Sequence, residues 1–176
     1  MNAPTLPWFW SRTADPARLL ALAAFDLTDP QLRRDLDAVA AAAAEATGHP
    51  KSVINMILTD VQMAVGAHGL DGWVARAGGT PAEWAFCLHV VLDRGPFVVP
   101  DARLEPRVAD SPLTLMGLSN SYTGVPVVDP VTGAALGALC VIDDEFGACT
   151  EADVPVLNAH AGLAAGVLER SAWREE

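Results

Sequence analysis

Basic residues are scarce in this sequence, which has a single lysine, Lys51. It has 11 lysines and arginines against 22 aspartates and glutamates, so its formal net charge is -11 at pH 7. Proteins that bind nucleic acid or anionic membrane surfaces use cationic side chains to contact phosphate groups. The charge balance therefore argues against nucleic acid and membranes as direct partners.

Cysteine is also rare. The three cysteines, Cys87, Cys140 and Cys149, are an odd number, and they lack the close pairs of a zinc ribbon and the framework of a secreted disulfide-rich domain. We therefore expect no metal site and a reducing, cytoplasmic setting.

Motifs for membrane insertion and phosphate binding are missing as well. The apolar run over residues 19–25 is far shorter than the about 20 residues that a membrane-spanning helix needs, and it makes a poor signal peptide. Glycines gather over residues 66–79, but without the Gly-x-Gly-x-x-Gly order or the Lys-Ser/Thr pair of a phosphate-binding loop. The sequence predicts none of these features.

The 176 residues, 51% of them hydrophobic, can build one domain with a substantial core. We place this domain at residues 14–172. Residues 1–13 have no helical or strand period and contain the aromatic cluster Trp8, Phe9 and Trp10. This segment is either a tail or an arm whose aromatic rings dock on a neighbouring subunit.

Two Asp-Pro start signals predict helices over residues 16–25 and 30–47. A third helix, over residues 154–168, follows a Thr-x-x-Asp capping signal and carries two apolar stripes. A helix with two apolar faces needs two partners. One would be a sheet, and the other is either the helix over residues 30–47 or the same helices of a second copy.

Residues 53–58 and 135–143 are apolar on both alternating faces, which is typical of central strands covered on each side. In the second strand, Leu136 should share a face with Ala138, Cys140 and Ile142. Further strands are predicted over residues 62–65, 97–99 and 121–128, the last joined to the strand over residues 135–143 by a hairpin turn.

Residues 84–92 are predicted to form a helix, because Thr80-Pro81-x-Glu83 has the form of a capping box. Cys87 and His89 lie two apart, so on a helix their side chains turn about 200° away from each other. This spacing argues against a thiol–imidazole pair and against a shared metal ion.

Several motifs then follow in a consistent order: Phe-Cys-x-His at residues 86–89, Val-Val-Pro-Asp-Ala at 98–102, Pro-Arg at 106–107, Tyr-x-Gly-x-Pro at 122–126 and Leu-Gly-Ala-Leu-Cys-Val-Ile-Asp at 136–143. The series resembles the motifs of GAF domains, and in particular a bacterial branch with a Phe-Cys-Ala-His core motif. The resemblance covers about residues 14–170. It is specific for the fold and much less so for the function, since one fold hosts many ligands.

With this resemblance the expected fold class is α/β (α+β), a GAF-like central antiparallel sheet of five to six strands with helices on both faces. The resemblance also implies a homodimer formed through the first and last helices, with a symmetric interface. The chain departs from the family after its first strand, where residues 59–63 replace an aspartate-rich turn and the second strand looks short.

Seven residues are candidates for contact with a small-molecule ligand. A histidine between apolar neighbours, an arginine and a lone tyrosine on a strand each lack an obvious partner in the sequence, and a ligand could provide one. For His89 and Arg107 the alternatives are structural: His89 would bond a backbone carbonyl or a carboxylate, and Arg107 would pair with Asp101 or Asp110. As a residue of the ligand pocket, His89 would have Asp101 as the partner that fixes its tautomer. The candidates are Phe86, Cys87, His89, Asp101, Arg107, Asn120 and Tyr122.

The expected function is that of a free-standing sensory or regulatory domain that binds a small molecule and signals through its dimer or a partner protein. One alternative is a ligand-free interaction module. Another is an enzyme that resembles the free methionine sulfoxide reductases, which use three cysteines on this fold. In that comparison Cys140 sits within a central strand rather than at a pocket rim, so we expect no enzymatic activity.

Cys149, just before a helix cap, is expected to be the most reactive thiol. The sequence lacks the bilin-attachment pattern, and neither haem nor bilin is expected.

Overall fold

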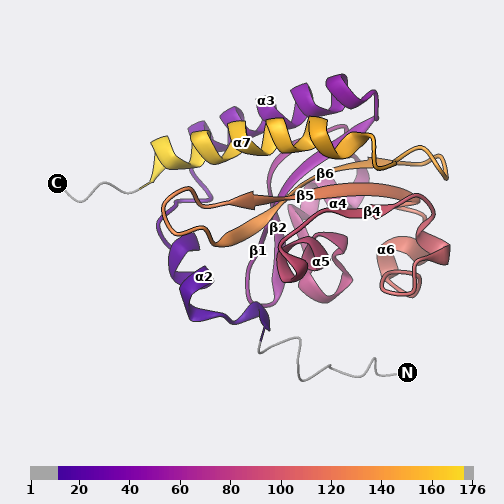
Figure 1. The fold of residues 1–176 in the computed structure, drawn as a ribbon, viewed down its shortest axis with the longest axis horizontal. Coiled ribbons are helices and arrows are strands. Elements are labelled where there is room, and N and C mark those ends of the chain that lie inside the picture. Colours follow the sequence, from indigo (N-terminus) through magenta and orange to yellow (C-terminus); the bar gives the residue numbers. More distant parts are fainter. Residues whose placement is uncertain (1–11, 173–176) are drawn as a thin grey trace.

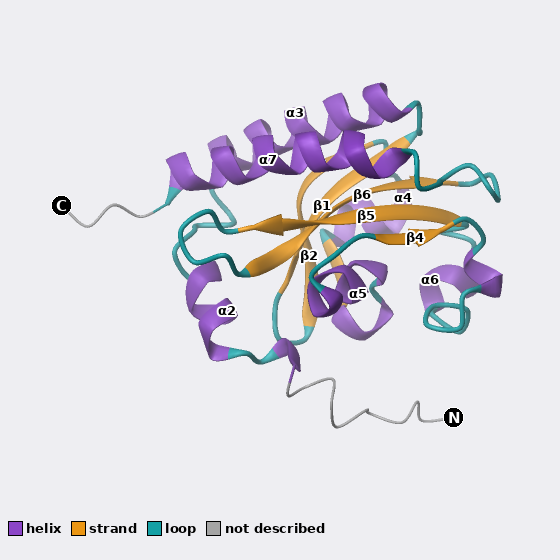
Figure 2. Ribbon diagram, viewed as in Figure 1, coloured by secondary structure: helices purple, strands orange, loops and turns teal. Residues whose placement is uncertain are grey.

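The computed structural model describes residues 12–172, which fold around one six-stranded sheet (Figures 1 and 2). The strands lie in the order β3-β2-β1-β6-β5-β4, and every neighbouring pair is antiparallel. The strands are β1 (Lys51–Ile57), β2 (Val61–His68), β3 (Gly79–Pro81), β4 (Phe97–Val99), β5 (Ser121–Val128) and β6 (Ala135–Asp143). The predicted fold class, an α+β domain with helices on both faces of an antiparallel sheet, is confirmed.

Helices cover the two faces of this sheet unequally. The long helices α3 (Pro30–Thr47) and α7 (Asp153–Ser171) lie side by side over one face, and α5 (Phe86–Asp93) lies against the other (Figure 1). The remaining helices are short: α2 (Pro16–Leu22), α4 (Gly72–Ala77), α6 (Pro112–Leu115) and two 3-10 turns, η1 (Ala82–Trp84) and η2 (Ala102–Leu104). Each face of the sheet therefore has its own apolar core.

The alternating faces of β1 show how the two cores form. Ile54 and Met56 point into the core beneath α3 and α7, whereas Val53 and Ile57 point into the core beneath α5. Both sets are almost fully buried. A central strand that is apolar on both faces is what the sequence predicted here.

Leu136 is an exception to the predicted alternation in β6. Cys140 and Ala138 face α5 as expected, but Leu136 lies in the core beneath α3 and α7. The pairing of β5 with β6 shifts register between Val127 and Val128, so β6 carries a bulge at this point. An extra residue in one strand reverses the side on which the residues beyond it lie. The prediction for Leu136 was wrong for this reason.

Helix starts follow the predicted Asp-Pro signals. Asp15 and Asp29 each accept a bond from a backbone N–H of the first turn, and α3 ends at Gly48 in the left-handed conformation, at φ +76°. The capping box predicted at residues 80–83 is wrong, because Thr80 lies in β3 and α5 begins at Phe86 without a side-chain cap. The second strand, predicted to be short, has eight residues.

The second partner of α7 is α3 of the same chain. This is the first of the two alternatives that the sequence left open, the helix over residues 30–47. Within residues 12–172, no helix is both long and apolar enough to cross a membrane. The predicted tail or arm, with Trp8, Phe9 and Trp10, lies outside the described residues.

Candidate functional site

A pocket opens on the face of the sheet that carries α5. Its open space, mouth included, is about 730 Å³. The floor is formed by strands β1, β2, β5 and β6, and the walls by α4, the start of α5 and the segment before β5. The apolar side chains that line it are Val53, Ala64, Leu70, Val74, Phe86, Leu113, Leu118 and Ile142. A concave, mostly apolar site of this kind is typical of small-molecule pockets.

Cys87 lies at the centre of the polar contacts in the pocket. Its sulfur accepts hydrogen bonds from the Tyr122 hydroxyl at 3.1 Å and from Asn55 Nδ2 at 3.5 Å. Burial alone would raise the pKa of Cys87, but its hydrogen bonds to Cys140, Tyr122 and Asn55 outweigh burial and lower it. The same contact with Cys87, together with burial, raises the pKa of Cys140 well above its ordinary value.

Gln62 and Ser119 add two polar groups that are not satisfied. Gln62 is 7% exposed and Ser119 is 3% exposed, and both line the pocket. Gln62 Nε2 donates to Thr80 Oγ1 at 3.1 Å, which fixes the carboxamide. Gln62 Oε1 and Ser119 Oγ are buried without a hydrogen-bond partner among the residues that the structure describes. A buried polar atom left unpaired costs about 1–3 kcal/mol, so a ligand or water that bonds it is favoured.

Two charged side chains, Lys51 and Asp71, line the pocket. Lys51 lines it, but its ammonium group is 3.0 Å from the Asp144 carboxylate. Asp71 lines it from an exposed position ahead of α4. The interior therefore offers hydrogen bonds without net charge.

Three of the seven predicted ligand-binding residues, Phe86, Cys87 and Tyr122, line this pocket. Phe86 and Tyr122 also pack ring to ring, with centroids 5.2 Å apart. Whether these residues contact a ligand stays a prediction.

His89 and Arg107 belong to a different part of the surface. The rings of His89 and Phe97 lie 5.2 Å apart, and the Arg107 guanidinium stacks over Phe97 at 4.3 Å. Arg107 also pairs with Glu105 and Asp93, both at 3.1 Å. Desolvation and the nearby Arg107 lower the pKa of His89. The pairing of Arg107 with Asp101 or Asp110 was wrong.

Asp101 and Asn120 also have partners of their own. Asp101 accepts the backbone N–H of Arg103 at the start of η2, and both of its carboxylate oxygens bond the Arg103 side chain. That hydrogen bond lowers the pKa of Asp101. Asn120 donates to the Asp144 carbonyl at 2.9 Å. The structure thus brings neither Asp101 nor Asn120 to the pocket lining, and the predicted His89–Asp101 pairing is replaced by Asp101–Arg103.

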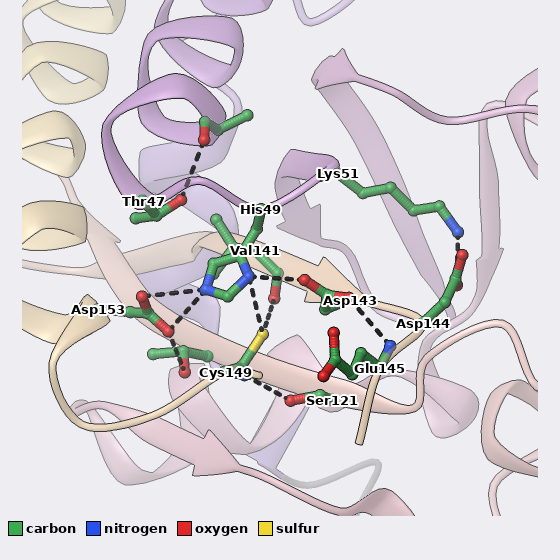
Figure 3. A network of polar contacts seen from close by, with 12 residues as sticks. Thr47, His49, Lys51, Ser121, Val141, Asp143, Asp144, Glu145, Cys149 and Asp153 are labelled. Carbon is green, nitrogen blue, oxygen red and sulfur yellow. Dashed lines mark hydrogen bonds and ion pairs between the residues drawn. The ribbon is translucent and has the colours of Figure 1, made fainter. Parts of the chain in front are cut away.

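A second polar cluster joins three elements at the end of the sheet (Figure 3). His49, between α3 and β1, bonds Asp143 through Nδ1 at 2.9 Å and Asp153 through Nε2 at 3.0 Å. Cys149 lies beneath the ring, with its sulfur 3.9 Å from Nδ1. Both ring nitrogens of His49 thus face carboxylate oxygens from two different elements. We refer to His49, Asp143, Cys149 and Asp153 as the His49 clamp.

The His49 clamp changes the expectation for Cys149. This thiol is fully buried, and burial together with Asp153 and Asp143 raises its pKa to about 12. The prediction that it is the most reactive cysteine was therefore wrong. Ligand atoms of His49, Cys149 and Asp153 lie within 4.8 Å of one another, a spacing that could hold a metal ion. A metal would have to replace a carboxylate at one ring nitrogen, so the geometry favours the contacts with Asp143 and Asp153.

The fold has a counterpart among known protein families. The family model described as GAF domain matches residues 31–168, which is most of the chain. This chain belongs to the GAF domain family. The resemblance seen in the sequence motifs is thereby confirmed.

Other GAF domains and GAF-fold enzymes share the architecture at low sequence identity. The GAF domain of a phosphoenolpyruvate-protein phosphotransferase from Acinetobacter has a TM-score of 0.64 and 17% identity, over 97% of this chain and 96% of that one. A type II free methionine-R-sulfoxide reductase from Thermoplasma acidophilum has a TM-score of 0.64 and 17% identity, over 84% of this chain and 98% of that one. At this identity the likeness shows the fold alone.

A relative in sequence is a cyclic di-GMP phosphodiesterase of Pseudomonas aeruginosa, which is 40% identical over 87 residues. The match covers 48% of this GAF domain chain but only 14% of the phosphodiesterase. The activity of that much longer protein is therefore a property of that protein.

The sequence analysis did not predict the polar groups that the structure leaves unpaired in the pocket. Gln62 was predicted only to begin a strand over residues 62–65, and no role was predicted for Ser119. One signal could have identified Gln62: it is a polar residue among apolar ones in a predicted strand, and a polar side chain that is buried there needs a partner. For His49, two residues after a helix end, the sequence carries no signal of its distant partners.

Proposed function

We propose that this GAF domain is a sensory or regulatory module that binds a small molecule in the pocket beneath α5. The observation that carries the proposal is a pocket with apolar walls whose floor spans four strands of the sheet. Its strand β6 contributes Cys140 to the pocket and Val141 to the opposite core. A ligand that shifts this strand acts on both faces at once, provided that it binds one conformation better than the other.

Native mass spectrometry of the purified protein tests the proposal. We expect a mass above that of the chain that is lost under denaturing conditions. In Ala64→Trp the new ring fills the pocket, and the additional mass should disappear. Ala17→Trp, at an exposed position of α2, places the same ring away from the pocket and should retain it. An adduct equally abundant in both variants would place the bound molecule elsewhere.

A thiol enzyme is the second candidate, because Cys87 lies in the pocket and its hydrogen bonds lower its pKa. We favour binding over catalysis, since Cys140 and Cys149 are buried and their pKa values are raised. A thiol-coupled assay with free methionine sulfoxide separates the two. Turnover that is lost in Cys87→Ser would establish the enzyme.

We further propose that the protein acts as a homodimer, or through a signalling partner, by way of α3 and α7. Leu163 on α7 supports this, because 59% of its surface is exposed on the side of the helix away from the sheet core. The three free cysteines support a cytoplasmic setting.

A further inference from the structure

The buried polar groups of the pocket restrict the chemistry of its ligand, if the proposed function holds. Side chains that line the pocket and are themselves buried carry no charge within residues 12–172. Gln62 and Ser119 each present an unpaired polar atom there, and both side chains are more than nine-tenths buried. A ligand that enters the pocket can form hydrogen bonds with these two atoms.

An anionic ligand is disfavoured inside. Gln62 Oε1 is a hydrogen-bond acceptor and would repel a carboxylate or phosphate oxygen. The one cation in the lining, Lys51, is already paired with the Asp144 carboxylate at 3.0 Å. A buried anion without a paired cation is strongly unfavourable.

A cationic ligand is disfavoured for the corresponding reason. The carboxylate of the lining, Asp71, lies in an exposed position before α4, where water screens it. The interior around Phe86 and Val53 is apolar. A buried ammonium group would there lack a counter-ion.

Gln62 and Ser119 mark two separate ends of the pocket. Gln62 pairs with Ile57 at the end of β1, whereas Ser119 precedes Ser121, which pairs with Asp143 beyond the start of β1. A small molecule held at Gln62 is therefore remote from Ser119.

We propose that the pocket takes an uncharged organic ligand with an apolar body and an amide- or lactam-type group bound to Gln62. Such a group presents an N–H donor beside a carbonyl acceptor. Its N–H can donate to the unpaired Gln62 Oε1, while Gln62 Nε2 stays bonded to Thr80 Oγ1. Ser119 Oγ provides a second hydrogen bond for a longer ligand.

Four probes of one shape test the ligand class: benzamide, benzoate, benzylamine and toluene. At neutral pH they are a neutral amide, an anion, a cation and an apolar reference. We expect ligand-observed NMR titrations to give the lowest Kd for benzamide, with benzoate and benzylamine at least about tenfold weaker. Toluene, which fits the apolar walls but bonds nothing, should bind measurably and less tightly than benzamide.

Substitutions at Gln62 and Ser119 test which residue forms the hydrogen bond with benzamide. Gln62→Met keeps the side-chain length and should weaken benzamide about tenfold while leaving toluene unchanged. Gln31→Met, the same change at an exposed position of α3, is the matched control and should alter neither Kd. Ser119→Ala should change benzamide binding less than twofold, because benzamide does not span the pocket.

The failure modes are distinct. If a charged probe or toluene matches benzamide, or if Gln62→Met behaves like Gln31→Met, the ligand class is wrong and the small-molecule pocket stands. If none of the four probes binds, toluene included, the pocket is closed and the proposed function fails with it.

Discussion

Burial and hydrogen bonds together set the pKa of each cysteine. Cys149 has its pKa raised to about 12, and burial with a bond to Cys87 raises that of Cys140. Cys87 alone has a lowered pKa and also faces the pocket. The environment of each sulfur therefore predicts an order of thiol reactivity, which the positions of the cysteines in the sequence do not.

Alkylation by iodoacetamide at pH 8, followed by peptide mapping, measures this ranking. A thiol with a pKa of about 12 is ionised to about one part in ten thousand at this pH, so Cys149 should react very slowly in the folded protein. We expect Cys87 to be labelled first, and all three cysteines to react rapidly in urea. Labelling of Cys149 ahead of Cys87 in the folded protein would contradict the ranking.

Asp143 of the His49 clamp gives the protein a defined acid sensitivity. Although partial burial opposes it, the bond from His49 lowers the pKa of Asp143 below its ordinary value of 3.8. A carboxyl group with a lowered folded-state pKa stabilises the fold above its unfolded-state pKa. That contribution is lost as the pH falls below 3.8 and through the lower folded-state pKa.

We expect Asp143→Asn to reduce the free energy of unfolding by about 2 kcal/mol at pH 7. The difference from the wild type should persist at pH 5 and shrink below about pH 4, as measured by urea denaturation. Asp144→Asn is the matched control, because that carboxylate is 66% exposed and its ion pair with Lys51 contributes little. An equal loss in both variants would rule out a special role for the His49 clamp.

At the scale of elements, the contact between β1 and β6 depends on a glycine. A Cβ atom on Gly137 would lie 1.8 Å from the Asn55 carbonyl oxygen and 2.9 Å from the Met56 Cα atom. Both are backbone atoms of the neighbouring strand, so they cannot move aside as a flexible side chain does. The central pair of strands therefore requires glycine at this position.

Gly137→Ala should lower the free energy of unfolding by at least about 3 kcal/mol, measured by chemical denaturation. Gly162→Ala is the matched control, since a Cβ atom at Gly162 in α7 meets nothing within 4 Å. Alanine favours the helix there, so this control should be neutral or more stable by up to about 1 kcal/mol. A Gly137→Ala protein of unchanged stability would contradict the strand contact.

The sequence predicted helix ends well where the stabilising hydrogen bonds join residues close together in the chain. The Asp-Pro starts and the Gly48 stop depend on hydrogen bonds within one turn, and the sequence contains both partners. The bulge that turns Leu136 to the other face depends on the register between β5 and β6, which strand periodicity does not contain. The predicted cap at Thr80 failed because pairing of β3 with β2 took that residue into the sheet.

The candidate site could be predicted only in part for the same reason. Phe86, Cys87 and Tyr122 come from elements whose faces follow from periodicity, and they line the pocket. His89 and Arg107 have no obvious partner in the sequence. In the fold His89 packs against Phe97, and Arg107 pairs with Asp93 and Glu105. The partners of a polar side chain are set by tertiary packing, so sequence spacing identifies candidates without their contacts.

At the scale of the whole molecule, the predicted homodimer depends on the outer side of α3 and α7. We expect Leu163→Glu to convert a dimer into a monomer in analytical ultracentrifugation without loss of stability, because this side chain is 59% exposed and its replacement leaves the core intact. Leu115→Glu, at a 72% exposed leucine of α6, is the matched control and should leave the mass unchanged. A wild-type protein that is monomeric at high concentration would overturn the dimer.

The strand order has a consequence for how the chain is synthesised. β1 lies between β2 and β6, so one edge of β1 waits for a strand that leaves the ribosome roughly 80 residues later, or about 4–16 s at ordinary translation rates. Through that interval an apolar edge with free backbone groups is open to pairing with other chains. Synthesis is therefore a stage at which the unpaired edge of β1 can form contacts with other chains.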